Sequence, residues 1–386
     1  MTYKSIKGKK ISTLGMGNMR LPKDGGGHID EKKALEIIDY AYQNGVNYYD
    51  TAYRYHSGES ELFIGKALSR YPRDTWYLAT KFPGHMMQYK DGKLEMIGYL
   101  SGETIGSVEE VFEDQLERCG VEYFDFYLLH NVSESSFEFY TNEKLNIMGY
   151  LRSQKEKGRI RHLGFSSHGR ADTIKNFLDL EGDCIDIVQI QLNYLDWKMQ
   201  QAEDKYELLV KREMPIVAME PVRGGSLASL GEESDKVLKA ARPDYSIASW
   251  AFRYLQSLPG IYIALSGMTT LEQITENVKI FSNPEPMSDS EKTLLEKAMQ
   301  AIIDLIPCTS CRYCCEGCPK ELDIPKLISM YNEMKYNNAP IRFAIKSMEE
   351  HELPSACISC GSCAKLCPQN IDIPAMMTEF DKMINR

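Results

Sequence analysis

Apolar and polar positions alternate on two scales through residues 1–283 of this chain. Short runs rich in β-branched and aromatic residues are separated by longer stretches in which apolar residues recur at helical spacing. This alternation predicts repeated strand and helix units around a parallel sheet. Eight runs are expected to be strands: 13–19, 47–51, 76–81, 124–130, 162–166, 185–192, 216–219 and 261–266.

The longer stretches predict helices at 31–43, 59–69, 108–118, 143–156 and 271–280. Glycines stand where three of these helices would end, at Gly45, Gly120 and Gly158. Eight strand and helix units in a segment of this length predict an α/β fold, the (β/α)₈ TIM barrel.

The barrel is expected to end at 283–286, because the sequence Asn-Pro-Glu-Pro cannot continue a helix. Ser288 and Glu291 then have the spacing of a capping box, which predicts a helix that reaches to about residue 305. The chain is therefore expected to divide into a barrel at 1–283, a linker helix at 284–304 and a C-terminal domain at 305–386.

Cysteines are concentrated in the C-terminal domain, where nine of the eleven fall in the last 79 residues. They form the pattern C-x2-C-x2-C-x3-C-P twice, at 308–319 and 357–368, with every matched cysteine displaced by 49 residues. The sequence Leu-Asp-Ile-Pro at 322–325 returns as Ile-Asp-Ile-Pro at 371–374 with the same offset. An internal duplication is predicted, with two half-modules.

This spacing is typical of cysteines that bind two [4Fe-4S] clusters. Gaps of two residues let three thiolates converge on one cluster, and the cysteine before proline ligates the other cluster. The expected ligand sets are Cys308, Cys311, Cys314 and Cys367 for one cluster, and Cys357, Cys360, Cys363 and Cys318 for the other.

Structural zinc is the alternative, but zinc sites commonly use paired C-x2-C units without a third cysteine or a closing Cys-Pro. Cys315 directly follows Cys314 and could replace it in a shifted register, although only Cys314 keeps the 49-residue symmetry. Over about 80 residues the repeat resembles the bacterial two-cluster ferredoxin family. The resemblance implies an α-rich, ferredoxin-like domain with two [4Fe-4S] clusters.

Charge and composition narrow the class of protein further. The net charge of -10 disfavours nucleic acid as a partner, because binding to phosphate backbones needs clustered Lys and Arg. The chain shows neither the long apolar stretch of a membrane span nor the apolar core of a signal peptide. We therefore expect a cytoplasmic protein without a membrane partner.

Four polar residues lie at or just after the ends of expected strands, where a (β/α)₈ barrel places its chemistry. Asp50, Lys81 and His130 end three strands, and Tyr55 follows Asp50 on the next loop. Their settings are Gly-Val-Asn-Tyr-Tyr-Asp-Thr-Ala-Tyr-Arg-Tyr, Ala-Thr-Lys and Leu-Leu-His. In these settings the four residues resemble the aldo/keto reductase family over the whole barrel.

The resemblance implies that the chain reduces a small carbonyl compound with NAD(P)H. Tyr55 would protonate the carbonyl oxygen, Lys81 would lower the pKa of Tyr55, and Asp50 would keep that lysine charged. His130 would orient the carbonyl group. The residues alone leave a simpler interpretation open, in which Asp50 and Lys81 form a buried ion pair and Tyr55 is an aromatic residue at the rim.

The resemblance also assigns residues to a nicotinamide nucleotide. The segment Gly-Phe-Ser-Ser at 164–167 and Gln189 match the family's contacts to the carboxamide group. Gly267 and Gln273 stand where relatives that prefer NADP place Lys and Arg, so we expect weak discrimination or a preference for NADH. The expected cofactor residues are Ser166, Ser167, Gln189, Met219, Arg223, Gly267, Gln273 and Asn277.

In this interpretation the clusters carry electrons or dock a redox protein partner. Two alternatives stay open at this point. The clusters could feed single electrons to the barrel with the help of a flavin, although no flavin motif is recognisable, or the chain could be a non-catalytic nucleotide or redox sensor. The complete set of Asp50, Tyr55, Lys81 and His130 favours catalysis.

Overall fold

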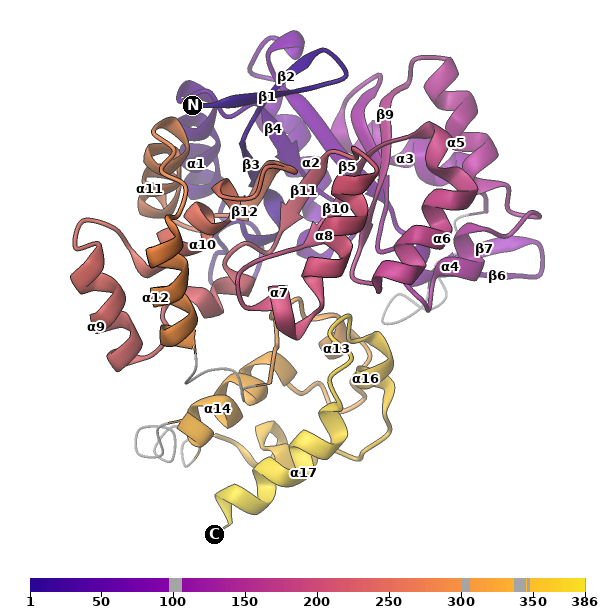
Figure 1. Cartoon of the computed structure of the whole chain (residues 1–386). Helices are drawn as coiled ribbons and strands as arrows, with labels where there is room; N and C mark the ends of the chain where they lie inside the picture. Colours follow the sequence, from indigo (N-terminus) through magenta and orange to yellow (C-terminus); the bar gives the residue numbers. More distant parts are fainter. Residues whose placement is uncertain (97–105, 300–305, 337–344, 346–347, 386) are drawn as a thin grey trace.

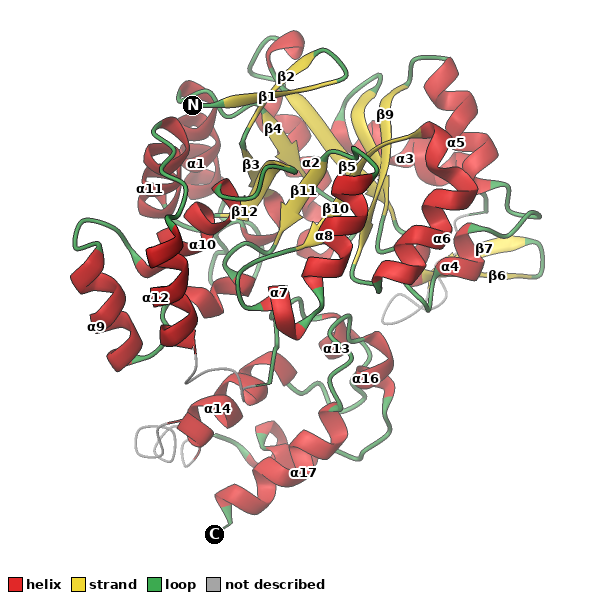
Figure 2. Ribbon diagram, viewed as in Figure 1, coloured by secondary structure: helices red, strands yellow, loops and turns green. Residues whose placement is uncertain are grey.

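The expected barrel is present in the computed structural model, which describes residues 1–96, 106–299, 306–336, 345 and 348–385. Eight parallel strands close into a barrel in the order β10-β11-β12-β3-β4-β5-β8-β9. Helices surround the strands (Figures 1 and 2). The (β/α)₈ fold class is therefore confirmed.

The barrel strands lie close to the predicted runs. They are β3 (Leu14–Gly17), β4 (Tyr48–Asp50), β5 (Tyr77–Phe82), β8 (Phe124–Leu129), β9 (Ile160–Ser167), β10 (Ile185–Gln191), β11 (Ile216–Met219) and β12 (Ile261–Gly267). The helices that follow them in turn are α1 (Glu31–Gln43), α2 (Glu59–Leu68), α3 (Val108–Cys119), α5 (Ile147–Glu156), α6 (Ala171–Glu181), α8 (Ala202–Lys211), α10 (Ile247–Gln256) and α11 (Leu271–Ser282).

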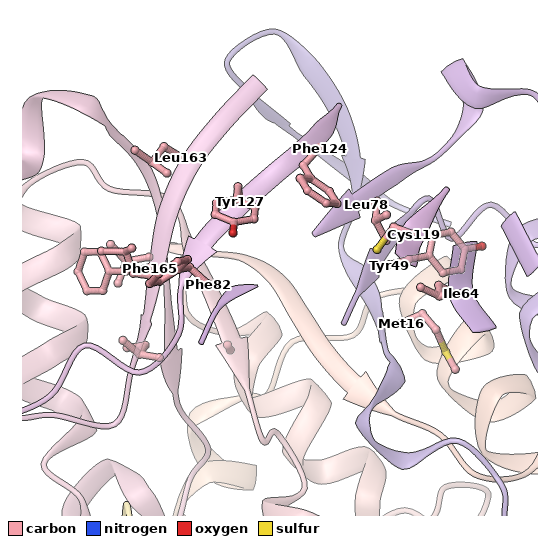
Figure 3. Close-up of a cluster of buried hydrophobic side chains, with 14 of the residues drawn as sticks. Met16, Tyr49, Ile64, Leu78, Phe82, Cys119, Phe124, Tyr127, Leu163 and Phe165 are labelled. Atoms are coloured by element: carbon pink, nitrogen blue, oxygen red, sulfur yellow. The ribbon is translucent and has the colours of Figure 1, made fainter. Parts of the chain in front are cut away.

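Two layers of apolar side chains hold the barrel together. One fills its interior with residues such as Phe126, Leu128 and Val217. The other lies between the strands and the surrounding helices, and Figure 3 shows part of it, including Phe124 and Cys119. Each barrel strand is thus buried on both faces, which explains why the strand runs are so apolar.

The structure adds two hairpins that the sequence pattern did not predict. β1 (Tyr3–Ile6) and β2 (Lys9–Ser12) pair at the start of the chain and contribute Ile6 and Ile11 to the barrel interior. β6 (Met87–Lys90) and β7 (Lys93–Met96) pair within the long connection between β5 and α3.

Further elements stand in loops or after the barrel: α4 (Phe137–Tyr140), α7 (Asp196–Met199), α9 (Glu232–Ala241) and α12 (Asp289–Met299). The predicted helix at 143–156 starts only at Ile147, because Asn146 has a left-handed φ of 45°. The end of the predicted helix at 288–305 lies outside the described residues, as does part of the connection after β7.

The C-terminal domain, as far as it is described, consists of helices and loops around its own apolar core. α13 (Tyr313–Glu316) and α14 (Ile324–Tyr336) are matched by α16 (Ser362–Leu366) and α17 (Ile373–Ile384), each of which begins 49 residues later. The duplication read from the sequence is therefore a duplication of structure.

This domain lies against the carboxyl ends of the barrel strands (Figure 1). The candidate site described below is at the same end of the barrel. Among the described residues, no helix has the length and apolar character needed to cross a membrane.

One buried carboxylate ties α2 to β5 and α3. Glu61 is fully buried and accepts hydrogen bonds from Thr80 Oγ1 (2.5 Å), Gln115 Nε2 (2.6 Å) and Arg118 Nε (2.9 Å). We expect Glu61→Ala to lower the free energy of unfolding by about 3 to 5 kcal/mol, because it leaves a guanidinium without its charge partner. Denaturant unfolding followed by circular dichroism measures the loss.

The exposed pair of Glu232 and Lys236 provides the control for this prediction. Glu232→Ala should change the free energy of unfolding by less than about 0.5 kcal/mol. Equal losses in the two variants would contradict the role of Glu61 in the barrel wall.

Candidate active site and cysteine sites

Asp50 and Lys81 form a buried ion pair at the carboxyl ends of two neighbouring strands. Lys81 Nζ lies 2.6 Å from Asp50 Oδ1 and 2.7 Å from the carbonyl oxygen of Thr51. Burial raises the pKa of Asp50 and lowers that of Lys81, and the attraction between the two groups opposes both shifts. Each group therefore depends on the other to stay charged.

Tyr55 is placed beside this pair by a tight turn after β4. The next two residues, His56 and Ser57, have left-handed φ angles of 53° and 55°, a conformation that is costly for residues other than glycine. Lys81 Nζ lies 5.0 Å from the centre of the Tyr55 ring. The three residues that were expected to act together are thus neighbours.

The pKa of Tyr55 does not match the sequence-based expectation. Burial first, and then the negative charge of Asp50, raise this pKa well above its usual value. Burial and Asp50 therefore outweigh any attraction from the Lys81 ammonium, which is bound by Asp50 and Thr51, and the pKa of Tyr55 is raised instead of lowered as predicted. The Tyr55 hydroxyl therefore keeps its proton at neutral pH.

His130 directly follows β8 and faces Tyr55, with 5.9 Å between the two ring centres. Burial, and then the neighbouring His85 and Lys81, lower the pKa of His130 well below its usual value. Its imidazole is therefore neutral at pH 7 and can form hydrogen bonds without carrying charge.

A cavity of about 300 Å³ joins this group to most of the expected cofactor residues. Asp50, Tyr55 and His130 line it, whereas Lys81 is fully buried and does not. The expected cofactor residues that also line it are Ser166, Gln189, Met219, Gly267, Gln273 and Asn277.

Two expected cofactor residues do not line this cavity. The hydroxyl of Ser167 donates to the carbonyl oxygen of Val132 at 2.6 Å. The guanidinium of Arg223 is bound by Asp196, with Nε 3.0 Å from its Oδ1. Both side chains are therefore committed to contacts within the protein.

The cavity fits a nicotinamide nucleotide in its hydrogen-bonding capacity. Among the described residues, the buried Gln189 Oε1 and His130 Nδ1 have no hydrogen-bond partner. Buried polar atoms normally find partners, so atoms like these indicate a place where a ligand supplies them. An amide oxygen such as Gln189 Oε1 accepts hydrogen bonds, as the carboxamide of a nicotinamide requires.

The predicted cluster ligands fall into two groups in space. We call Cys308, Cys311, Cys314 and Cys367 the inner cysteine set, and Cys318, Cys357, Cys360 and Cys363 the outer cysteine set. The outer cysteine set lines one cavity, whose walls come only from the C-terminal domain. Cys318 thus lines the same cavity as the three cysteines of the other half-module.

The inner cysteine set is gathered beside the barrel. Burial, and then the carboxylate of Glu220, raise the pKa of the Cys311 thiol, and the nearby Cys367 and Cys308 raise it further. Four crowded thiols with raised pKa values suit a cationic iron centre, which would compensate their negative charge. Cys367 thus lies near Cys311 and Cys308, and its role as a ligand of their cluster stays a prediction.

The loops that carry both sets have matching backbone conformations. Ser310 and Ser359 both have a φ of 54°, and their amides donate to the sulfur atoms of Cys308 and Cys357 at 3.4 Å. Amide donors toward sulfur are a normal feature of the surroundings of iron–sulfur clusters. The donor chemistry and the loop geometry thus fit two clusters.

The inner cysteine set lies at the interface with the barrel. Arg223 Nη2 donates to the carbonyl oxygen of Pro307 at 2.7 Å, and Arg20 Nη2 donates to that of Thr309 at 3.0 Å. Gly224 allows this approach, since a Cβ atom there would lie 2.1 Å from the Thr309 oxygen.

The sequence provided no reason to place several other residues at this cavity. Cys311 and Tyr313 come from the C-terminal domain but line the same cavity as Tyr55. Glu220 also lines this cavity. Burial, followed by the negative charge of Asp196, raises the pKa of Glu220 to about 8. These residues are separated widely along the chain, so only the folded structure brings them together.

The comparisons with known proteins agree with this architecture. A family model described as the aldo/keto reductase family matches residues 13–299. The chain belongs to this family. A second model, described as a 4Fe-4S dicluster domain, matches residues 307–371.

Relatives match this aldo/keto reductase mainly through its barrel. The oxidoreductase YqkF of Bacillus subtilis, described as uncharacterized, is 26% identical over 307 residues, covering 74% of this chain and 92% of YqkF. The NADH-specific methylglyoxal reductase of Escherichia coli is 27% identical over 327 residues, covering 76% of this chain and 96% of that protein.

Solved structures give the same result. The holo form of aldo-keto reductase AKR11C1 from Bacillus halodurans has a TM-score of 0.60 and 26% identity, covering 77% of this chain and 96% of that chain. This aldo/keto reductase is therefore an NAD(P)H-dependent oxidoreductase with a 4Fe-4S dicluster domain. The family models support a nicotinamide cofactor and iron–sulfur clusters and offer no support for a flavin.

The crossed arrangement of cysteines predicts how iron content responds to substitution. Anaerobically reconstituted protein should hold about eight irons per chain, and Cys318→Ser should lose roughly half of them. Cys315 provides the control. It directly follows Cys314 but is not among the expected ligands, so Cys315→Ser should keep the full iron content. Iron and acid-labile sulfide assays measure both; stoichiometric zinc in the wild type would contradict the assignment.

Proposed function

We propose that this aldo/keto reductase reduces the carbonyl group of a small molecule to an alcohol, with Tyr55 as the proton donor. The observation that supports this most directly is the single cavity lined by Asp50, Tyr55 and His130 together with Ser166, Gln189 and Asn277. This cavity is thereby lined by a proton donor, by a group able to orient a carbonyl and by candidate nucleotide contacts.

A bound reduced nicotinamide supplies a hydride to the carbonyl carbon. Tyr55 gives the carbonyl oxygen its proton, so that one hydride and one proton convert the carbonyl into an alcohol. The negative charge left on the Tyr55 oxygen is stabilised by the ammonium of Lys81, which Asp50 holds in place at 2.6 Å. His130, being neutral, orients the carbonyl oxygen through a hydrogen bond.

Tyr55→Phe tests this assignment. The substitution removes the transferable proton and keeps the ring, so kcat should fall by roughly 10²- to 10⁴-fold while the Kd for the nucleotide stays within about twofold. Steady-state kinetics and a fluorescence titration of the nucleotide measure the two quantities.

Tyr53 provides a matched control, because it lies two residues away and its ring packs on Arg118, not in the cavity. Tyr53→Phe should keep near-native kcat. If Tyr55→Phe also turned over at the native rate, Tyr55 would not be the proton donor.

The charge of the nucleotide cleft predicts its selectivity. Gly267 and Gln273 offer no positive charge for a 2′-phosphate, and the Gln273 side chain accepts from the amide of Thr269 at 2.7 Å. Arg20 does line the cleft, but its guanidinium donates to Thr309. We expect Kd values for NADH and NADPH within about tenfold, or tighter binding of NADH.

Parallel titrations with the two nucleotides measure this selectivity. Arg20→Met tests whether the guanidinium of Arg20, which lines the cleft, contributes to it. A strong preference for NADPH that disappears in Arg20→Met would show that Arg20 recognises the 2′-phosphate.

A second candidate function is favoured by the position of Cys311, which lines the same cavity as Tyr55. When assembled, clusters supply single electrons, and the inner cysteine set would bring them to the wall of the catalytic cavity. A one-electron donor protein could then replace the nucleotide, with two electrons and two protons consumed for each alcohol formed.

Anaerobic assays separate the two functions. The nucleotide mechanism predicts alcohol formation with NADH or NADPH and no reduced-cluster signal in electron paramagnetic resonance, because a hydride is a two-electron donor. The second function predicts alcohol formation with reduced methyl viologen alone, at two viologen radicals per alcohol. If no alcohol formed with either electron donor, binding or sensing would remain as the role of the chain.

A further inference from the structure

The two cysteine loops of the C-terminal domain share a backbone conformation but differ in their surroundings. Counterparts 49 residues apart are Thr309 and Ile358, Ser310 and Ser359, and Cys311 and Cys360. In the first loop Thr309 is only 1% exposed, and its carbonyl oxygen accepts from Arg20 of the barrel at 3.0 Å. In the second loop all three counterparts are exposed. The first loop is thus docked on a protein surface, whereas the second is open to solvent.

The side chain of Ile358 is not required by the fold of its loop. It is 57% exposed, and among the described residues of the C-terminal domain no other large apolar side chain is exposed. The docked loop carries threonine at the same position, so this backbone conformation does not depend on isoleucine. Ile358 also lines the cavity of the outer cysteine set. An apolar side chain there gains stability only when a partner removes it from water.

Two lysines flank the second loop. Lys320 lines the cavity of the outer cysteine set, and Lys365 lines a neighbouring cavity that also reaches Cys318. Both lysines are exposed, and neither forms an ion pair with a described residue. Among the described residues, Glu316 is the one carboxylate that lines either cavity, and it is partly buried. The chain has a net charge of -10, so these lysines form a local exception that would attract an acidic partner.

We propose that Ile358, Cys360, Lys320 and Lys365, which we call the outer face, dock a small acidic electron-carrier protein. Because Cys360 is itself exposed, a protein docked on this face touches an expected cluster ligand. The carrier gives up one electron, which the cluster held by the outer cysteine set takes up, and no proton or bond is transferred. The inner cysteine set lies on the side of the catalytic cavity, which Cys311 lines.

The inference deepens the second candidate function, and it rests on the two clusters assumed there. A binding experiment tests the outer face without turnover. The probe is a purified acidic flavodoxin in its oxidised form, titrated calorimetrically into the reconstituted holoprotein. Binding should weaken as salt is added, because exposed charges are screened. Ile358→Thr, which gives the second loop the residue of the first, and Lys365→Glu should each raise the Kd by about tenfold.

Lys382→Glu is the matched control, since it makes the same change of charge within the same domain. Pro374, near the start of α17, lines the outer cavity, and Lys382 lies roughly 12 Å further along this helix. The control should leave the Kd for flavodoxin within about twofold of the wild-type value. All variants should keep about eight irons per chain, which separates a lost contact from a lost cluster.

The rate of cluster reduction provides a second measurement. Under anaerobic conditions, flavodoxin reduced beforehand should bleach the cluster absorbance of the wild-type holoprotein in stopped-flow experiments. At carrier concentrations below the Kd, this rate should fall about tenfold in Ile358→Thr and in Lys365→Glu. Photoreduced deazaflavin, a small neutral donor that needs no docking, should reduce the clusters of all variants at the wild-type rate.

Absence of flavodoxin binding to the wild type, or equal Kd values and reduction rates in the wild type and both variants, would overturn the outer face as the docking site. A holoprotein dimer that Ile358→Thr dissociates in analytical ultracentrifugation would assign the face to a second copy of this chain and overturn the proposal too. Docking and cluster reduction without any alcohol formed would keep the outer face and refute the second candidate function.

Discussion

The arrangement of this molecule depends on one buried guanidinium. Arg223 lies between Asp196 of the barrel, at 3.0 Å, and the carbonyl oxygen of Pro307 at the start of the first cysteine loop, at 2.7 Å. Asp196 is fully buried and also accepts from Gln191, whose side chain meets Gln369 of the second cysteine loop. Because an unpaired buried charge is costly, the ion pair fixes where both loops meet the barrel.

A consequence of this docking is that the catalytic cavity does not belong to the barrel alone. Cys311 and Tyr313 form part of its wall, and they belong to a segment whose ordering would depend on iron, as metal binding commonly couples to folding in small domains. The barrel has its own apolar core and the C-terminal domain another. Cluster assembly would thereby affect the shape of this cavity without any electron having to move between the two domains.

The sequence predicted the features that arise from local or repeated patterns. The strands of the barrel could be found because each is buried on both faces, and the cysteine repeat because its 49-residue offset is kept down to the φ angles of Ser310 and Ser359. The hairpin of β6 and β7 was missed although its residues alternate between apolar and polar and flank the turn sequence Asp91-Gly92, because each strand is only four residues long and lies within a long connection.

The candidate site was predictable only in part, for a physical reason. Asp50, Lys81 and His130 could be found because strand ends have fixed positions in a barrel. Gln189 and Ser166 were assigned by the family resemblance, and both line the cavity. Ser167 and Arg223 were assigned by similarity, yet they form contacts that depend on neighbours in space. The direction of the Tyr55 pKa shift was also missed, because desolvation is a property of the folded pocket.

The relatives share the barrel chemistry but not the whole pocket. Matches that span 92% to 96% of the bacterial relatives span only 74% to 77% of this chain, so about a quarter of it lies outside them. Tyr313 lies outside residues 13–299, which the family model matches, and its hydroxyl lies 3.4 Å from His130 Nε2. Since discrimination between substrates arises from the groups that touch them beyond the reacting atoms, the substrates of barrel-only relatives do not transfer to this chain. Under the proposed function, the contacts of the C-terminal domain take part in selecting the carbonyl compound.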